Sequence, residues 1–443
     1  MKNVSEMPQR LICNPLAQSA KPHPDPVLVT KASKLLLASK APLIIIGKGA
    51  AHARAEDVIN EFVSSANLPF LPTPMGKGVV PDDSKLNASA ARSTALREAD
   101  VILILGARLN WILHFGEPPK FRPDVKIIQI DISAQELGWK NGVGESSLGI
   151  VSDIGAFMQA LHAEMRGKLQ SITRNKSPPW LDRLSAASLK NEKKAQDMAM
   201  SVTRSGSPLT YQRAFHLIKE TLHRHSPPSD GRIVYVSEGA NTMDISRSIF
   251  PLQFPRQRLD AGTHATMGVG MGYAIAAYIA HNLDSHPDAQ KAKKIVAFEG
   301  DSAIGFSAME IETMQRYKMP ILIFVLNNSG VYHGDSSSAG DWAALQNQTL
   351  AKQGSSDSGS ETRKGGLRST SLGYETRYEK LAEMVGARGA LVRTEDELVR
   401  ATSEGFQDDE NVWLVNVIIE PGLGKKIGFA WQQHGQAPKE SKL

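Results

Sequence analysis

The sequence predicts an α/β protein with two doubly wound parallel-sheet domains, and three observations support this fold class. Hydrophobic residues make up 41% of the 443 residues and charged residues 22%, which is the composition of an ordinary globular chain. Short apolar runs alternate with amphipathic helical patterns. The apolar runs lack polar alternation, as expected of strands that are buried on both faces of a parallel sheet.

The first domain is predicted to span residues 25–165, after a tail of residues 1–24. Its helical patterns are VLVTKASKLLLAS, ARAEDVINEFVSSA and ARSTALREA, and its strand patterns are PLIIIGKGA, ADVILILGARL and VKIIQIDIS. Strands that alternate with helices in this way predict a sheet with helices on both faces.

The second domain is predicted to span residues 207–424 and to follow a surface linker of residues 166–206. Its strand patterns include RIVYVSEG, KKIVAFEG, PILIFVLNN and WLVNVIIEPG. Residues 336–371 are dominated by serine, glycine and charge, which predicts a mobile insertion with too little apolar surface to stay ordered. Residues 425–443 form a polar tail.

Composition and the end of the sequence bear on partners and location. The net charge is +5, but the basic residues are scattered without interleaved aromatics, so we expect no nucleic-acid partner. The longest apolar run is far shorter than the about 20 residues of a membrane span, so we expect none. The sequence ends in Ser441, Lys442 and Leu443, a tripeptide that the peroxisomal import receptor reads at a free carboxyl terminus. This predicts a peroxisomal location.

The stretch GDSAIGFSAMEIETMQRYKMPILIFVLNN places polar residues at the ends of two strand patterns. A strand, a crossover helix and a parallel strand bring Asp301 and Asn328 to one sheet edge, where open α/β sheets bind ligands. A carboxylate, an amide oxygen and a nearby backbone carbonyl suit Mg²⁺ that also binds phosphate oxygens. The helix start at Ser302 can direct amides to the same phosphates. The stretch predicts a metal-bridged diphosphate site; the alternative is a pair of ordinary polar turns.

The stretches GDSAIGFSAMEIET, SEGANTMDISR, RLDAGTHATMGVGMGYAIAA and GARLNWILHFG resemble those of the 2-hydroxyacyl-CoA lyases, which are thiamine diphosphate-dependent enzymes related to oxalyl-CoA decarboxylase. The resemblance covers most of residues 25–424. It implies cleavage of a 2-hydroxyacyl-CoA, as in fatty acid alpha-oxidation, to formyl-CoA and an aldehyde one carbon shorter. The cofactor would serve as the electron sink.

The resemblance also implies which residues hold the tail of the cofactor. Asp301 and Asn328 would bind Mg²⁺ through their side chains, and Gly330 through its carbonyl. The residues that contact the diphosphate would be Ala240, Asn241, Ser302 and Ala303.

Three further residues would shape the reactive end of the cofactor. By the resemblance, Met267 is the apolar wedge that bends the cofactor into a V, and the Ala265 carbonyl accepts a hydrogen bond from the aminopyrimidine. Tyr332 would lie beside the reacting carbon as a catalytic residue. The alternatives are a core methionine and a buried structural tyrosine. Ala265 stands where glycine is usual, and His264 where an aromatic apolar residue is expected.

In the first domain, the resemblance assigns Lys48, Arg108 and Asp131 to an ADP moiety, either the nucleotide end of CoA or a separate ADP. A lysine and a guanidinium suit phosphate, and a carboxylate at a strand end suits ribose hydroxyls. Taken without the resemblance, each is an ordinary surface residue.

The family has a further amino-terminal domain that binds the pyrimidine and carries the glutamate that activates the cofactor, and this sequence starts where the central domain would. We therefore expect a homo-oligomer, as a dimer or tetramer, or a partner that supplies a pyrimidine-binding domain. Two other hypotheses stay open: an oxalyl-CoA decarboxylase-like enzyme, and a non-catalytic module that binds the cofactor.

Overall fold

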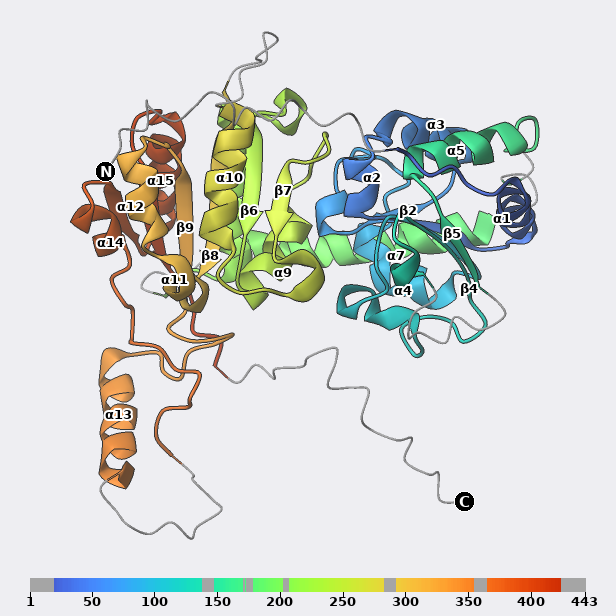
Figure 1. Cartoon of the computed structure of the whole chain (residues 1–443). Coiled ribbons are helices and arrows are strands. Elements are labelled where there is room, and N and C mark those ends of the chain that lie inside the picture. The colour runs from blue at the N-terminus through green and yellow to red at the C-terminus, as the bar shows by residue number, and fades with distance from the viewer. Residues whose placement is uncertain are drawn as a thin grey trace, which may run out of the picture.

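The computed structural model describes residues 20–137, 147–169, 172, 178–201, 207–282, 292–353 and 365–423. Figure 1 shows two α/β domains side by side, so the predicted fold class is confirmed. No helix in the described ranges has the length and apolar character needed to cross a membrane. The last three residues, Ser441–Leu443, and most of both predicted tails lie outside these ranges.

The first domain is built on a five-stranded parallel sheet with the order β2-β1-β3-β4-β5. Its strands are β1 (Pro42–Ile46), β2 (Phe70–Pro72), β3 (Val101–Leu105), β4 (Lys126–Asp131) and β5 (Leu148–Val151). Its α-helices are α1 (Pro26–Ala38), α2 (Lys48–His52), α3 (Glu56–Ala66), α4 (Arg92–Glu98) and α5 (Ile154–Glu164). Short 3₁₀ helices lie between them at Pro74–Gly76, Ser89–Ala91, Trp111–Gly116 and Ala134–Glu136.

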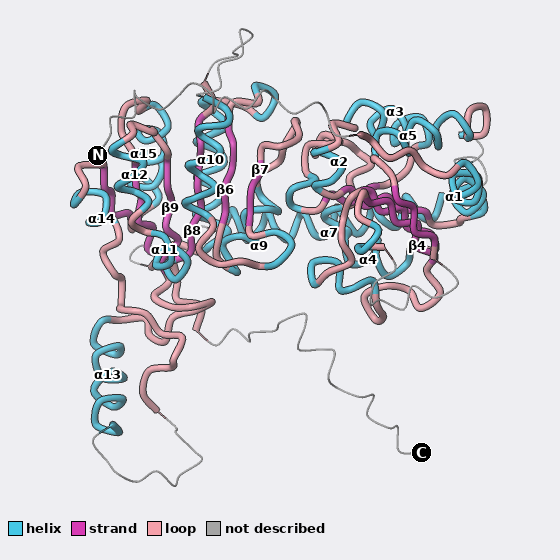
Figure 2. Tube along the Cα trace, viewed as in Figure 1, coloured by secondary structure: helices cyan, strands magenta, loops and turns pink. Residues whose placement is uncertain are grey.

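Two apolar cores cover the two faces of this sheet. Alternate residues of β1 separate the cores, with Ile44 and Ile46 in one and Leu43 and Ile45 in the other. The first core packs against α1, α3 and α5, and the second against α4 and the helix α7 (Pro178–Met200). Figure 2 shows the strands as a layer between helices.

The helix α7 lies within the predicted surface linker, and most of its residues are exposed. Trp180 and Leu184 are buried against the first sheet, and the Trp180 indole donates to the Pro42 carbonyl at 3.2 Å. These side chains are buried because the first turns of α7 carry a short apolar stripe at helical spacing. The stripe ends where the helix becomes exposed and charged.

The second domain has a six-stranded parallel sheet with the order β10-β11-β9-β8-β6-β7. Its strands are β6 (Ile233–Ser237), β7 (Arg258–Asp260), β8 (Lys294–Gly300), β9 (Leu322–Asn327), β10 (Arg388–Val392) and β11 (Trp413–Ile418). Its helices are α8 (Tyr211–His225), α9 (Ala240–Ile249), α10 (Gly270–Asn282), α11 (Asp301–Ser307), α12 (Glu310–Arg316), α13 (Ala339–Gln353), α14 (Glu379–Met384) and α15 (Glu395–Gln407). Short 3₁₀ helices lie at Pro228–Asp230 and Gly262–His264.

Helices cover both faces of this sheet as well. The cluster on one face contains residues of α8 and α15, and the cluster on the other contains residues of α10, α12 and α14. Strands β8 and β9 lie in the middle of the sheet with every residue buried, which places their carboxyl ends at a central position on one sheet edge.

The helix α13 corrects the expectation of an unstructured insertion. The segment 339–353 is helical and lies apart from both sheets in Figure 1. Its sequence, AGDWAALQNQTLAKQ, contains no proline and is rich in good helix formers. The Trp342 indole donates to the Leu372 carbonyl at 3.0 Å, which ties the helix to the returning chain. The middle of the insertion, residues 354–364, lies outside the described residues.

The two domains meet in a polar contact. Arg256 donates to Glu56 at 2.7 Å across the boundary. Asp82 accepts the Leu252 N–H at 2.8 Å and donates its own N–H to the Leu252 carbonyl at 2.9 Å. The backbone of Gly78 lies close to the backbone of the second domain. A Cβ on Gly78 would lie 2.0 Å from the Phe254 carbonyl oxygen. A close backbone contact therefore sets the spacing of the domains.

We predict that Gly78→Ala destabilises the chain more than Gly167→Ala. Both glycines have φ of +78°, so alanine costs about 1–2 kcal/mol at either position. Gly78 faces backbone, whereas no atom of the described residues lies within 4 Å of a Cβ on Gly167. The substitution of Gly78 should therefore cost about 1–3 kcal/mol more. Urea unfolding followed by tryptophan fluorescence measures the difference. Equal effects of the two substitutions would contradict a rigid domain contact.

Candidate cofactor site

The candidate site lies where β8 and β9 end. Strand β8 leads directly into α11 at Asp301, and β9 ends at Asn327, just before Asn328. The strands are adjacent and parallel, with Gly300 opposite Leu326, so Asp301 and Asn328 meet as the sequence predicts.

The Asp301 carboxylate is buried and holds the two strand ends together. One carboxylate oxygen accepts the Ser302 N–H at 2.8 Å, and the other accepts the N–H groups of Asn328 at 3.1 Å and Gly330 at 3.0 Å. Burial nevertheless raises the pKa of Asp301 to about 7, because desolvation outweighs these hydrogen bonds. A bound cation would offset this cost.

Asn328 supplies the feature that best fits a metal. Its side-chain amide nitrogen donates to the Tyr332 carbonyl at 2.9 Å, whereas its Oδ1 is buried and has no hydrogen-bond partner in the part of the chain that the structure describes. An unpaired buried oxygen beside a buried carboxylate is a donor set suited to a hard cation such as Mg²⁺. The described residues contain no cluster of three or more His, Cys, Asp or Glu with metal-site geometry, so this site depends on the amide and on backbone oxygen.

The loop that follows β9 is held in strained backbone conformations. Ser329 has φ of +63° and Tyr332 has φ of +69°, in the region that non-glycine residues rarely adopt. The Tyr332 carbonyl accepts from the amides of both Asn241 and Asn328 at 2.9 Å. Its side chain is half-buried, and burial together with the charge of Asp244 raises the pKa of the phenol. Strain of this kind is characteristic of functional loops.

Two helix starts lie together at this sheet edge. Ala240 and Asn241 begin α9, and Ser302 and Ala303 lie in the first turn of α11. The turns touch, since a Cβ on Gly239 would lie 3.1 Å from the Gly300 nitrogen. Ala240, Asn241 and Ser302 are partly exposed, whereas the Ala303 side chain is in the core. Backbone amides at such helix starts can bind a diphosphate.

The loop before α10 carries Ala265 and Met267. Met267 is 41% exposed, so it is not a core methionine. Ala265 is also exposed and adopts φ of +51° and ψ of +37°, a left-handed conformation that favours glycine. This explains physically why glycine suits the position.

Two glutamates at this edge were not predicted from the sequence. Glu238 follows β6, and Glu299 is the penultimate residue of β8; both are fully buried. The Glu238 carboxylate accepts the N–H groups of Gly268 and Gly270. Burial and the charge of Glu238 raise the pKa of Glu299 well above its usual range. The repeated Glu-Gly at the ends of RIVYVSEG and KKIVAFEG was the available sequence signal.

Lys48, Arg108 and Asp131 lie at the edge of the other sheet. Lys48 follows β1, Arg108 follows β3 and Asp131 ends β4. Because these three strands are neighbours in the sheet, the topology brings the three residues to one edge. Arg108 forms an ion pair with Glu136 at 3.0 Å, and Asp131 accepts the Ser133 N–H at 2.9 Å.

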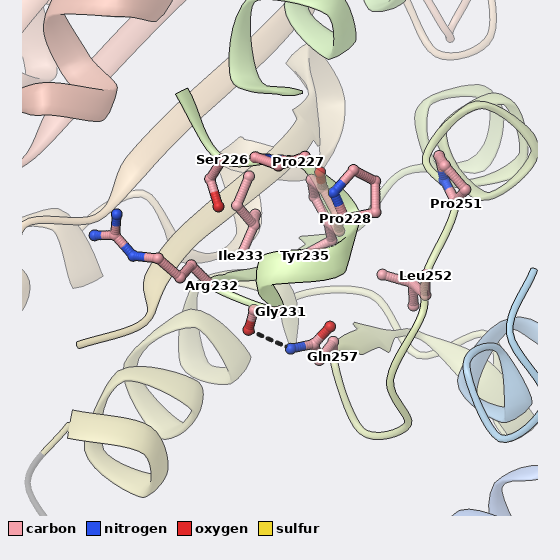
Figure 3. A pocket seen from close by; sticks show the side chains of 10 residues that line it. All are labelled: Ser226, Pro227, Pro228, Gly231, Arg232, Ile233, Tyr235, Pro251, Leu252 and Gln257. Atoms are coloured by element: carbon pink, nitrogen blue, oxygen red, sulfur yellow. Dashed lines mark hydrogen bonds between the residues drawn. The ribbon is translucent and has the colours of Figure 1, made fainter. Parts of the chain in front are cut away.

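Two cavities differ greatly in size. A groove of about 1160 Å³ lies between the domains, and among its lining residues are Arg92, Trp111 and Arg247. The cavity in Figure 3, at the amino end of β6, has a volume of about 10 Å³, which is room for little more than one water molecule. Of these two cavities, the groove is the one that is large enough for an organic ligand.

Comparisons with known proteins agree with this geometry. Residues 29–161 match "Thiamine pyrophosphate enzyme, central domain", and residues 238–417 match "Thiamine pyrophosphate enzyme, C-terminal TPP binding domain". A 2-hydroxyacyl-CoA lyase of Oryza sativa subsp. japonica is 40% identical over 90% of this chain and 63% of its own length. The oxalyl-CoA decarboxylase of Escherichia coli K12 is 37% identical over 91% of this chain and 63% of its own length.

A solved structure shares the fold. Benzoylformate decarboxylase from Polynucleobacter necessarius aligns with a TM-score of 0.62 and 18% identity over 94% of this chain and 68% of that one.

The matches to the two family models and to the lyase of Oryza sativa confirm the resemblance found in the sequence. The chain spans 63% of the length of the two curated relatives described here.

We predict that Ala265→Gly stabilises the chain by about 0.5–1 kcal/mol, because glycine adopts φ of +51° without the steric cost that alanine pays. Thermal unfolding measures the change. The matched control is Ala195→Gly on the exposed face of α7, which should destabilise by about 1 kcal/mol. Destabilisation by both substitutions would show that Ala265 is not strained.

We also predict a pH dependence that comes from Asp301. Its raised pKa of about 7 means that ionisation opposes folding of the metal-free chain. The stability of the wild type relative to Asp301→Asn should be greatest below about pH 4, fall as the pH rises to about 7, and then level off. Urea unfolding between these pH values without divalent cations measures this. The exposed Asp341→Asn is the control, and a flat difference for Asp301→Asn would contradict the burial argument.

Proposed function

The chain belongs to the thiamine pyrophosphate enzyme family, and on that premise we propose that it holds the cofactor in a 2-hydroxyacyl-CoA lyase. The reaction is cleavage of a 2-hydroxyacyl-CoA to formyl-CoA and an aldehyde one carbon shorter, a step of fatty acid alpha-oxidation. The observation that carries the proposal is the buried Asp301 carboxylate, which accepts the Asn328 N–H, together with the Asn328 Oδ1, which has no hydrogen-bond partner among the described residues. Both lie within a domain that matches the thiamine pyrophosphate-binding domain.

Each group of this edge has a role in the proposal. Asp301, Asn328 and the Gly330 carbonyl hold Mg²⁺, and the amides at the starts of α9 and α11 bind the diphosphate. Thiamine diphosphate supplies the electron sink for carbon–carbon cleavage when it is bound. Met267, exposed in front of α10, provides an apolar surface for the ring system. Tyr332 orients the reacting part of the substrate from the loop after β9.

The acyl-CoA substrate has two places to bind in this proposal. The groove between the domains, at about 1160 Å³, is large enough for a bulky ligand and carries Arg92 and Arg247. Lys48, Arg108 and Asp131 hold an ADP moiety at the edge of the first sheet, either that of CoA or a separate ADP. The resemblance and the neighbouring strand ends support this assignment.

A partner completes the site. Phe306 and Met309 are 65% and 61% exposed, and a Cβ on Gly268, next to Met267, would lie 3.3 Å from the Phe306 Cβ. Apolar residues exposed beside a site mark a protein contact. We propose that a pyrimidine-binding domain covers them, within a dimer or tetramer or on a separate partner. The Ser441–Leu443 tripeptide supports import into the peroxisome through its receptor.

The decisive experiment is an activity assay. The chain should convert a long-chain 2-hydroxyacyl-CoA to formyl-CoA and the shortened aldehyde when Mg²⁺, thiamine diphosphate and a separately expressed pyrimidine-binding domain are present. Mass spectrometry of both products measures the reaction. Oxalyl-CoA, offered in parallel, tests the decarboxylase alternative that the Escherichia coli relative raises.

Two variants make the assay specific. Asp301→Ala should abolish Mg²⁺-dependent cofactor binding and product formation while the chain stays folded, because it removes a charged metal ligand. Asp341→Asn, exposed on α13, should behave as the wild type. Cofactor binding without product from either substrate would leave a non-catalytic binding module and refute the lyase proposal.

A further inference from the structure

Glu238 connects two parts of the site that are distant in the sequence. Its backbone continues the pairing of β6 with β8, since the Glu238 N–H donates to the Phe298 carbonyl at 2.9 Å and the Gly300 N–H donates to the Glu238 carbonyl at 3.3 Å. Its side chain is fully buried and reaches the start of α10, where it accepts from the N–H groups of Gly268 and Gly270.

The two N–H groups belong to the segment that carries Met267. Residues 264–267 are exposed, and Gly268 and Gly270 are the points at which this segment enters the protein interior. A carboxylate that accepts two N–H groups at a helix start forms strong, charge-assisted hydrogen bonds and is favoured by the helix dipole. The position of Met267 therefore depends on a residue that is also bonded to the turn before Asp301.

We infer that Glu238 is a positioning residue that fixes the Ala265–Met267 segment relative to the diphosphate turn, so that the segment is shaped for the ring system of thiamine diphosphate before the cofactor binds. The inference rests on the proposed function. It assigns to Glu238 no contact with the diphosphate or the metal. Its effect should appear only for ligands that carry the ring system.

Glu299 provides a matched control on the neighbouring strand. Like Glu238 it is fully buried, and its Oε1 lies 2.1 Å from where a Cβ on Gly270 would be. Unlike Glu238, neither of its carboxyl oxygens has a hydrogen-bond partner among the described residues. Glu299→Gln thus alters a carboxyl group at the same depth without removing a bond to the segment.

The experiment compares the wild-type chain with Glu238→Gln and Glu299→Gln. Isothermal titration calorimetry gives the affinities for thiamine diphosphate and for inorganic diphosphate, both with Mg²⁺. Glu238→Gln should weaken thiamine diphosphate binding about tenfold and leave the affinity for inorganic diphosphate within about twofold. Hydrogen exchange at Gly268 and Gly270 should accelerate in Glu238→Gln and stay slow in Glu299→Gln. Glu238→Asp, which keeps the charge but shortens the reach, repeats the comparison if the glutamine variant does not fold.

The outcomes separate the inference from the proposed function. A folded Glu238 variant that keeps the wild-type ratio of the two affinities overturns the inference alone. An equal loss for both ligands also overturns it, because that loss would show a general structural role. A wild-type chain that binds neither ligand overturns the proposed function and the inference with it.

Discussion

At the functional edge of the second domain, the arrangement of the loops depends on the burial of the Asp301 carboxylate. A carboxylate in this position must be stabilised by hydrogen bonds, and the N–H groups of Asn328 and Gly330 provide them only because the loop after β9 turns back toward β8. That turn requires left-handed backbone at Ser329 and Tyr332. The strain is offset in part by the amides of Asn241 and Asn328, which both donate to the Tyr332 carbonyl.

The same edge joins elements from three parts of the sequence. The turn before α9 packs on the turn before α11, and Glu238 bonds the start of α10 to the end of β6. The three segments are thus connected by backbone contacts and buried hydrogen bonds, in addition to the apolar cluster that contains Met271 of α10 and Ile304 of α11. A site built in this way is rigid where the tail of a cofactor binds and exposed where a second domain can approach.

Sequence reasoning predicted most of the fold and part of the site for an identifiable reason. The adjacency of Asp301 and Asn328 follows from the handedness and parallel geometry of a crossover unit, which hold whatever side chains surround it. The bonds of Glu238 could not be predicted in that way, because they depend on where one side chain points and on a partner segment distant in the sequence. The helix α13 was not predicted, because the polar composition of its segment outweighed the helix propensity of its residues.

The exposed apolar residues beside the site affect how the abundance of the chain in a cell is determined. Met267, Phe306 and Met309 are large apolar side chains that lie exposed beside the site. Such surfaces are recognised by chaperones and by degradation machinery, and they promote self-association at high concentration. In the proposed assembly, the steady-state level of this chain should follow the supply of the domain that covers these residues, so that its abundance is regulated by assembly as well as by its own synthesis.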